Sequence, residues 1–464
     1  MCPIWPLHLI LLYLLALCPL WVLCQKLPSF SFDVLFEPNS TILHMDEYKY
    51  VNLTVKGNGL LEGDRIEVET NRDTVATAVM NSSYTLTQDE ASGGTWQGIM
   101  RVYGNFLGQA EISVKARRNN EEYKPEKTLP VTVIRPERVI DTIFVTSVAL
   151  FVSLIFINFG CAMHWPTVKE VMKRPIGPAI GLVGQFLFMP LMSFGLGYLI
   201  FPTQPDLHLG MFFTGVAPGG GASNIWTFIL GGNLNLSLAM TTISTLCAFG
   251  FMPMWLFSLG QVVFRNANIG VPYMRIATFV IGLLLPLGIG LAMQKFTPKI
   301  AAFMVRILKG FSTTLLLFII IFAIITNLYI FNLFTWQIIV AGMGIPWLGY
   351  MFGYLLAWVC KRPHEDSLAI SIETGIQNTG ISIFLLRYAL EQPSADIATV
   401  VPVSAAIMTP LPMMCIYIYQ KIKACMGATK GNKMITKKCL KTEYMQNPSP
   451  TASQPLMLPT NSAA

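Results

Sequence analysis

The chain has 464 residues, of which 53% are hydrophobic and 12% are charged. Soluble globular proteins usually carry about 25% charged residues, so the composition argues against a soluble protein and favours a membrane protein. The formal net charge of +7 is no sign of nucleic-acid binding, because most of the excess lies beside apolar runs and in the tail.

The first 25 residues predict a secretory signal peptide. An apolar stretch runs from about Leu9 to Leu23, and no charge precedes Lys26, so the prediction rests on the apolar stretch and the polar region after it. Cleavage is expected near Cys24 or Gln25, and a retained signal anchor is the alternative.

Residues 26–138 predict an all-β sandwich. Runs such as "YKYVNLTVKG", "YTLTQ" and "AEISVKA" alternate apolar and polar residues, and Gly, Asn and Asp clusters separate them at roughly 8–15 residues. The segment contains no cysteine, so an inter-sheet disulfide is excluded. Sequons at Asn39, Asn52 and Asn81 predict a glycosylated extracellular or luminal domain.

From Val139 to residue 421, apolar segments follow one another, each long enough to cross a bilayer as a helix. They lie near 140–163, 176–201, 209–230, 234–259, 274–295, 311–332, 337–360, 367–388 and 396–420. The fold class predicted here is an α-helical polytopic membrane protein of nine spans, preceded by the β-sandwich ectodomain.

Charges on the connecting loops predict the orientation of this membrane domain. Lys and Arg follow spans one, five, seven and nine, whereas "FPTQPDLHL", "NLFT" and "EQPSAD" have none. The loop "GQVVFRNANIGVPYMR" carries two arginines and is the one imperfect case. The positive-inside rule therefore places the ectodomain outside and the C-terminus in the cytosol, and the plasma membrane is favoured over internal membranes. Residues 422–464 begin basic and end rich in Pro, Ser and Thr, which predicts a disordered cytosolic tail.

Glu373 lies in the eighth predicted span, where an unpaired charge costs about 2.5–3.5 kcal/mol on insertion scales. Three interpretations are open: a protonated structural acid, a proton relay, or a carboxylate held against a bound cation. The neighbouring sequence "ETGIQN" favours the third. It combines a carboxylate, a hydroxyl and amides with a glycine, and backbone carbonyls freed from a helix can bind sodium.

The third predicted span contains "PGGGASN" at 218–224. Pro218 lacks an N–H donor and the glycines add backbone freedom, so a helix break is expected at Pro218, Gly219, Gly220 and Gly221. A proline kink with glycine packing is the alternative. Two interrupted polar spans in the two halves of one bundle indicate a transporter site built from discontinuous helices.

Two other spans carry polar side chains. Ser237 and Thr241 lie four residues apart on one helix face, and ordinary interhelical hydrogen bonding is the alternative to ion binding. Gln185 precedes Pro190 in the second span, and a single intramembrane glutamine is compatible with several roles.

Together these motifs resemble the bile acid:sodium symporter family. The shared marks are "QFLFMP", "PGGGASN", "NLSLAMTTISTL" and "ETGIQN", and the long ectodomain resembles that of the orphan members. The resemblance implies a core domain with two crossing broken helices, a separate panel domain and inverted repeats. It also implies two sodium sites. One would comprise Ser223, Asn224, Ser237, Thr241 and Glu373. The other would comprise Gln185, Glu373, Gln377 and the carbonyls of Thr374 and Ile376. Thr214 and Asn378 are substrate candidates.

These features predict a sodium-coupled secondary active transporter of an organic anion, possible substrates being a bile acid or a sulfated steroid. The expected partners are sodium, the organic anion and the lipid bilayer, without nucleic acid, and no cofactor other than the coupling ions is expected. Gly221, Ala222 and Asn233 depart from the family pattern, which leaves bile acid itself open. A receptor acting through the glycosylated ectodomain and a proton-coupled carrier are the alternatives. No Ser/His/Asp set, phosphate-binding loop or Cys/His cluster predicts an enzyme or a transition-metal site.

Overall fold

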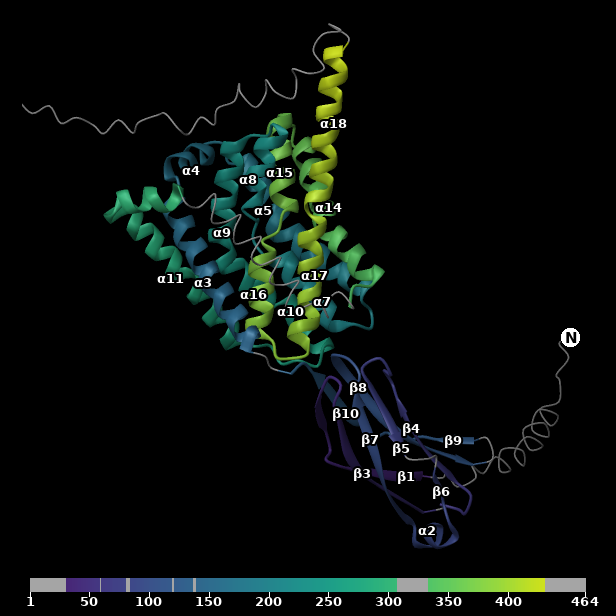
Figure 1. The fold of residues 1–464 in the computed structure, drawn as a ribbon. Coiled ribbons are helices and arrows are strands. Elements are labelled where there is room, and N and C mark those ends of the chain that lie inside the picture. Colours follow the sequence, from purple (N-terminus) through teal and green to yellow (C-terminus); the bar gives the residue numbers. More distant parts are fainter. Residues whose placement is uncertain are drawn as a thin grey trace, which may run out of the picture. The chain divides into compact units, whose positions relative to one another are not determined.

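The computed structural model divides into two compact units, Met1–Arg138 and Val139–Ala464, whose elements are drawn in Figure 1. It describes residues 31–58, 60–80, 84–118, 121–136, 139–306 and 333–429. The predicted signal peptide, Asn81, the sixth predicted span at 311–332 and the tail from residue 430 lie outside the described residues.

The N-terminal unit is built from two β-sheets. The four-stranded sheet has the order β1 (Ser31–Glu37), β3 (Tyr48–Asn58), β7 (Thr95–Gly104) and β5 (Ala76–Met80), with antiparallel neighbours. The second sheet has the order β2 (Thr41–His44), β10 (Leu129–Ile134), β8 (Gly108–Arg118), β4 (Arg65–Thr70) and β6 (Tyr84–Thr85), and β9 (Glu121–Tyr123) also pairs with β8. In this sheet β2 and β10 are parallel.

Both sheets contribute to a single apolar core. Leu53 and Val102 come from the four-stranded sheet, Ile66 and Ile112 come from the other, and all four are fully buried. Burying a side chain of this size contributes about 1.5–3 kcal/mol, so the period-two alternation of the sequence is the source of this unit's stability.

The run "YTLTQ" was expected to be extended, and it is a strand only at Tyr84–Thr85 before helix α2 (Gln88–Gly93) begins. Thr87 and Glu90 form a capping box, in which the Glu90 carboxylate accepts from the Thr87 backbone N–H at 3.0 Å. Such a pair satisfies N–H groups that the first helical turn leaves open, which explains why the strand ends here.

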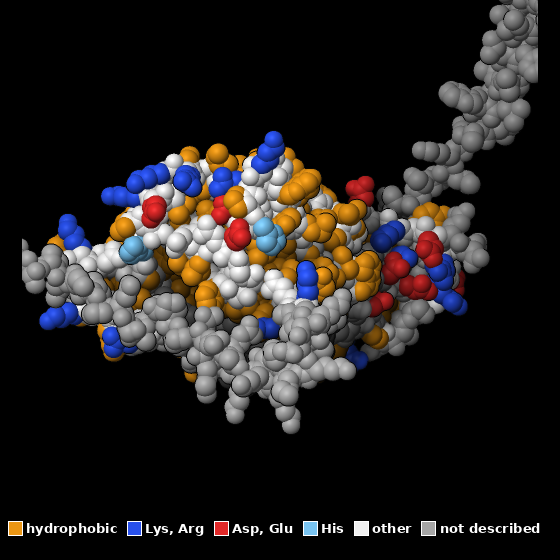
Figure 2. Space-filling view, turned by 90° about the horizontal axis from the view of Figure 1, so that it is seen from above, with side chains coloured by type: hydrophobic (Ala, Val, Ile, Leu, Met, Phe, Trp, Pro, Cys, Tyr) orange, Lys and Arg blue, Asp and Glu red, His pale blue; other side chains and the backbone are white. Residues whose placement is uncertain are grey.

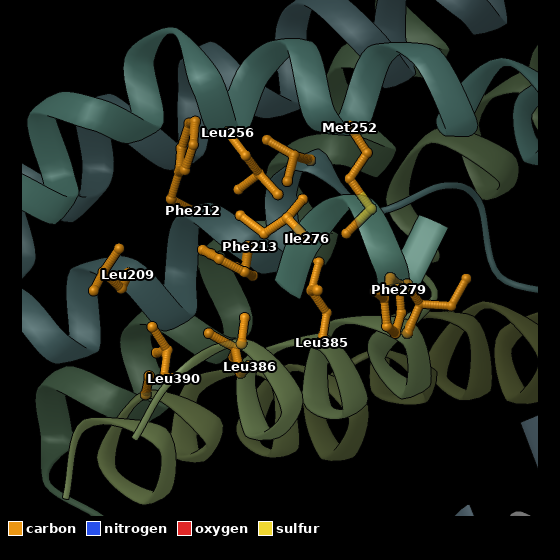
Figure 3. Packing of buried hydrophobic residues seen from close by; sticks show 14 of the residues in the cluster. Leu209, Phe212, Phe213, Met252, Leu256, Ile276, Phe279, Leu385, Leu386 and Leu390 are labelled. Atoms are coloured by element: carbon orange, nitrogen blue, oxygen red, sulfur yellow. The ribbon is translucent and has the colours of Figure 1, made fainter. Parts of the chain in front are cut away.

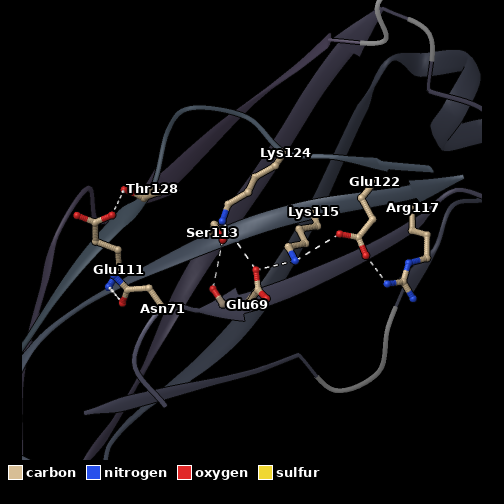
Figure 4. A network of polar contacts seen from close by, with 9 residues as sticks. All are labelled: Glu69, Asn71, Glu111, Ser113, Lys115, Arg117, Glu122, Lys124 and Thr128. Atoms are coloured by element: carbon tan, nitrogen blue, oxygen red, sulfur yellow. Dashed lines mark hydrogen bonds and ion pairs between the residues drawn. The ribbon is translucent and has the colours of Figure 1, made fainter. Parts of the chain in front are cut away.

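Charged side chains cover the outer face of β4, β8 and β9 (Figure 4). Lys115 Nζ lies 2.7 Å from Glu69 Oε2, and Arg117 pairs with Glu122. The hydrogen bond from Lys115 lowers the pKa of Glu69, and that from Arg117 lowers the pKa of Glu122. These pairs are solvated and belong to the surface, where ion pairs contribute little stability.

The second unit is helical. Its elements are α3 (Val139–Ala162), α4 (Trp165–Met172), α5 (Ile176–Val183), the π-helical turn η1 (Gly184–Phe188), α6 (Met189–Ile200), α7 (Pro205–Val216), α8 (Ala222–Leu230), α9 (Leu234–Phe257), α10 (Leu259–Asn266), α11 (Tyr273–Phe296), α14 (Trp336–Val359), α15 (His364–Gly375), α16 (Thr379–Ala389), α17 (Ser394–Met408) and α18 (Pro410–Thr429). Among the described residues, five helical segments are long and apolar enough to cross a membrane, or six if the pair bent by 68° at residues 163–164 is one span.

The surface of this unit suits a lipid environment. Large apolar side chains such as Leu199, Met274 and Phe296 are exposed to about three quarters of their area, which is unusual for a soluble protein. Figure 2 looks onto the end of the unit near α4, α8 and α15 and shows Lys and Arg side chains among apolar ones. The prediction of apolar membrane-type helices is therefore confirmed.

A buried apolar cluster holds the interrupted helices in place (Figure 3). Phe212 and Phe213 of α7 and Leu385 of α16 pack with Leu256 of α9 and Ile276 of α11, and each of these side chains is fully buried. Because such interiors are close-packed, this cluster fixes where the polar ends of α7 and α16 lie.

Candidate functional site

Two helices of the helical unit are interrupted within their apolar segments. The first break lies between α7, which ends at Val216, and α8, which begins at Ala222. The second separates α15, ending at Gly375, from α16, beginning at Thr379. Ala217 and Ile376 both adopt extended backbone geometry at these breaks, so the main chain leaves the helix at both places.

The two breaks cross and hydrogen-bond to each other. Gly219 and Gln377 form an antiparallel bridge, the Gly220 N–H donates to the Ile376 carbonyl at 2.7 Å, and the Asn378 N–H donates to the Pro218 carbonyl at 2.9 Å. A Cβ on Gly220 would lie 2.9 Å from the Gln377 carbonyl oxygen. The crossing therefore satisfies backbone groups freed by the breaks, and it requires glycine where the chains approach most closely.

Glu373 lies on α15, two residues before that helix ends, and it is 2% exposed. Its Oε2 accepts hydrogen bonds from Ser223 Oγ at 2.6 Å and Thr241 Oγ1 at 2.9 Å. Its Oε1 is buried and has no hydrogen-bond partner within the described ranges. None of the ion pairs of the described part of the chain includes Glu373. One carboxylate oxygen is therefore bound by hydroxyls, and the other is an open acceptor.

Asn224 extends this cluster toward α9. Its Oδ1 accepts from Ser237 Oγ at 2.8 Å and from Thr241 Oγ1 at 3.3 Å. The five residues of the first expected sodium site thus come from α8, α9 and α15 and are joined by direct contacts: Ser223, Asn224, Ser237, Thr241 and Glu373.

The second expected group assembles around Gln185 in the π-helical turn η1. Gln185 Nε2 donates to the Ala217 carbonyl at 2.6 Å and to Gln377 Oε1 at 2.7 Å, while Gln377 Nε2 donates to the Thr374 carbonyl at 2.8 Å. The Ile376 carbonyl already accepts from Gly220 in the crossing. Within the described part of the chain Glu373 makes no hydrogen bond to this group, but Glu373 and Gln185 line the same cavity.

That cavity lies behind the crossing and has a volume of about 10 Å³, which is room for about one water molecule. Gln185, Ser244 and Glu373 are its polar lining residues, and the rest of the wall is Pro178, Gly181, Leu182, Met240 and Ile243. Ser244 was not predicted from the sequence. It follows Thr241 by three residues and Ser237 by seven on α9, so helical spacing from those two residues is the signal that could have found it.

A second small cavity, with a volume of about 20 Å³, lies beside Pro218. Apart from Thr245 its lining is apolar or aromatic: Phe156, Pro218, Ala248, Phe249, Met252, Phe279, Val280, Leu283 and Ile381. Thr214 lines neither of these two cavities. Its hydroxyl is buried and donates to the Gly210 carbonyl of the same helix. Asn378 lies in the crossing and caps α16, where its Oδ1 accepts from the Ile381 N–H at 3.2 Å.

Two charged contacts near the ends of α15 and α16 were not predicted from the sequence. Arg387 and Asp396 form an ion pair at 2.8 Å with side chains 9% and 1% exposed. Asp366 pairs with Arg362 at 2.6 Å and accepts from Asn233 Nδ2 at 2.8 Å. The amide at position 233 fits this place because an aspartate there would face the Asp366 carboxylate.

The sequence of this chain is similar to those of known transport proteins. The model of the Sodium Bile acid symporter family matches residues 149–333. The human Hepatic sodium/bile acid cotransporter is 31% identical over 255 residues, which is 53% of this chain and 72% of that protein. The rat Sodium-dependent organic anion transporter is 30% identical over 53% of this chain and 65% of its own length.

The human P3 protein is 31% identical over 272 residues, covering 58% of this chain and 57% of its own length. The chain thus spans somewhat over half the length of this relative. Among solved structures, domains 4 and 5 of the S-layer protein SbsC cover 23% of this chain at 16% identity with a TM-score of 0.17, which is too low to bear on the fold.

Proposed function

Because this chain belongs to the sodium bile acid symporter family, we propose that it is a sodium-coupled symporter of an organic anion. Relatives with 27–31% identity include the human Ileal sodium/bile acid cotransporter, the rat Sodium-dependent organic anion transporter and the human Hepatic sodium/bile acid cotransporter. The family is one of transporters, which agrees with a chain that is not an enzyme.

The observation that carries the proposal is the environment of Glu373. A buried carboxylate with hydroxyl donors on one oxygen and an open second oxygen is expensive unless a cation joins it. Oxygen atoms of Ser223 and Thr241 lie within 2.9 Å of its Oε2, and a small cavity that Gln185 and Ser244 also line adjoins the residue. Hard oxygen ligands of this kind suit a small hard cation.

We assign the first sodium ion to the cluster of Ser223, Asn224, Ser237, Thr241 and Glu373. The second ion would occupy the cavity behind the crossing, with the Gln185 and Gln377 side chains, Glu373 and the Thr374 and Ile376 carbonyls as ligands. Sodium would then displace the internal hydrogen bonds that now hold these amides together. Glu373 would serve both ions, so that its single negative charge offsets part of their positive charge.

The small apolar cavity beside Pro218 marks where the hydrocarbon part of an amphipathic substrate would bind. Its wall offers aromatic and aliphatic contacts with one hydroxyl, and because its volume of about 20 Å³ is far below that of a ligand pocket, binding a bile acid or sulfated steroid would require it to open. Pro218 belongs both to this cavity and to the crossing, where its carbonyl accepts from Asn378. Sodium bound behind the crossing would therefore stabilise the backbone at Pro218, which also forms part of the wall on the side where the substrate is proposed to bind.

Transport would follow alternating access. Sodium entering from outside gains about 2.3 kcal/mol per charge across 100 mV of membrane potential. This gain would drive relative movement of a core domain that contains the crossing and a panel domain. The proposed arrangement has nine spans, a glycosylated β-sandwich ectodomain outside and the C-terminus in the cytosol of the plasma membrane.

The test is sodium-dependent stabilisation of the purified full-length protein, followed by sodium-dependent uptake of sulfated steroids and bile salts in cells. Glu373→Gln should abolish both responses, because it keeps the shape of the side chain and removes its charge. Glu365→Gln is the matched control, since Glu365 lies in the first turn of the same helix and is exposed.

Three outcomes would contradict the proposal. A Glu373→Gln protein that keeps the sodium response of wild type would contradict the assignment of both sodium sites. Uptake driven by a pH gradient without sodium would indicate a proton-coupled carrier. A protein that neither responds to sodium nor transports, yet binds a ligand through its β unit, would be a receptor.

A further inference from the structure

The outer face of the four-stranded sheet carries exposed aromatic and aliphatic side chains between charged ones such as Glu37 and Arg101. Tyr48 and Tyr50 on β3, Val79 on β5 and Ile99 on β7 are between 49% and 62% exposed. The strand register places Tyr50 and Val79 on either side of Arg101. A group of exposed apolar side chains on neighbouring strands indicates a surface that binds another molecule or a covalently attached group.

A glycosylation sequon lies within this face. Asn52 and Thr54 are two residues apart on β3, so they project from the same side of the sheet as Tyr50, while Val51 and Leu53 are buried on the other side. Asn52 is exposed and is paired across the sheet with Glu37 on β1 and Ile99 on β7. The acceptor asparagine is therefore in the interior of the face, with strands on both sides.

We propose that the N-linked glycan on Asn52 packs on Tyr50 and Ile99, so that this apolar face is covered by the protein's own sugar. The inference rests on the outward topology of the β unit in the proposed function. Tyr50 precedes Asn52 by about 6.6 Å along the strand, and Ile99 lies opposite at about 5 Å between Cβ atoms. The first sugar residue is thus attached between the Tyr50 ring and the Ile99 side chain.

The chemistry of the two partners is complementary. The face of an aromatic ring is electron-rich, and the C–H groups on one side of a pyranose ring carry slight positive polarity. A glycan bound there removes apolar area of Tyr50 and Ile99 from water without requiring a second protein. A bulky sugar in the interior of the face also obstructs protein partners, which is why we assign the surface to the glycan.

Asn39 provides an internal contrast. It is exposed between β1 and β2, and the residue two positions before it is Glu37. A glycan at Asn39 therefore has no preceding aromatic ring, and its removal should leave the stability of the β unit nearly unchanged.

The experiment uses full-length protein from a glycosylating cell, carrying Asn39→Gln and Asn81→Gln so that Asn52 is the remaining sequon of the β unit. The rate of proteolysis within the β unit is measured at raised temperature before and after enzymatic removal of the glycan. We expect removal to accelerate cleavage about 2- to 10-fold, the range of one aromatic contact. The same acceleration is expected in Tyr48→Thr, whereas in Tyr50→Thr removal should change little. Threonine is chosen because it retains strand propensity.

Trimming the glycan to its first sugar should retain most of the protection, because that residue makes the proposed contact. Equal acceleration in Tyr50→Thr and Tyr48→Thr would overturn the inference. An unmodified Asn52 beside a glycosylated Asn39 in wild type would also overturn it, as would a dimer that dissociates on Tyr50→Thr, which would make the face an interface between copies.

These outcomes separate the inference from the proposed function. Loss of sugar at every sequon would contradict the outward topology and this inference together. Sodium-dependent uptake by a protein in which the Asn52 glycan and Tyr50 act independently would contradict the inference alone.

Discussion

Glutamate side chains occupy contrasting environments in the two units. Glu69 in the β unit is half exposed and lies 2.7 Å from the ammonium group of Lys115. Glu373 in the helical unit is buried, and its hydrogen-bond partners are the hydroxyls of Ser223 and Thr241. Water can replace the partner of the first carboxylate at little cost, whereas the second is 2% exposed and depends on its buried partners. Burial without a fixed cationic partner, and not residue type, is therefore the reason for proposing Glu373 as a cation ligand.

The largest effect is expected from filling the space beside the open oxygen of Glu373. A Cβ on Gly219 would lie 2.5 Å from Glu373 Oε1, whereas a Cβ on Gly221 meets nothing within 4 Å. Gly219→Ala should abolish sodium-dependent stabilisation and uptake, and Gly221→Ala should leave both near wild type. Uptake assays and sodium titrations of thermal stability measure the difference, and a sodium response retained by Gly219→Ala would show that Oε1 is not a ligand.

Breaking the buried ion pair of Arg387 and Asp396 should have the next largest effect, on stability. Arg387→Met leaves the Asp396 carboxylate buried without its cation, which costs about 3–5 kcal/mol. Replacing both residues by apolar ones should recover much of the loss, because a buried pair contributes little beyond an apolar pair of similar volume. Thermal denaturation in detergent tests this, and a double variant as unstable as the single one would contradict it.

A smaller effect is expected from single hydroxyls around Glu373. Thr241 contacts both Glu373 and Asn224, whereas the neighbouring buried Thr242 donates to the Leu238 carbonyl of its own helix. Thr241→Val should weaken sodium binding roughly 10-fold, because removing one buried partner costs about 1–3 kcal/mol. Thr242→Val is the matched control in the sodium titration, and equal losses in the two variants would indicate a packing effect.

The smallest effect is expected in the charged face of the β unit. Hydrogen bonds from Lys115 and Arg117 lower the pKa values of Glu69 and Glu122 from 4.5, so the folded unit favours their charged forms. Their contribution is complete above the ordinary carboxyl range and is lost as the pH falls through the lowered pKa values. Protease resistance of the β unit should fall slightly below about pH 4.5, and Glu69→Gln should reduce that dependence. An undiminished acid response in Glu69→Gln would assign the effect to other carboxyls.

The comparison of the two units also shows where sequence reasoning was sufficient. Period-two alternation predicted β structure at residues 26–138, and long apolar runs predicted membrane-type helices, because both patterns are local consequences of burial on one face or all around. The motifs around Gln185, Ser223 and Glu373 led to the family, which the comparisons confirm. The strand expected through Leu86 and Thr87 failed because a local capping box competes with strand pairing.

The sequence by itself determined the class of membrane protein, its family and the chemical types gathered in the interrupted segments. Only the tertiary structure decided that Gly219 and Gln377 pair, that Glu373 has one satisfied and one open oxygen, and that Ser244 joins the cavity. It also decided that Arg387 is buried against Asp396 and that Tyr50 shares a face with Ile99. The physical reason is that these contacts join residues distant along the chain. Their geometry depends on how helices and strands pack, which local periodicity and composition do not encode.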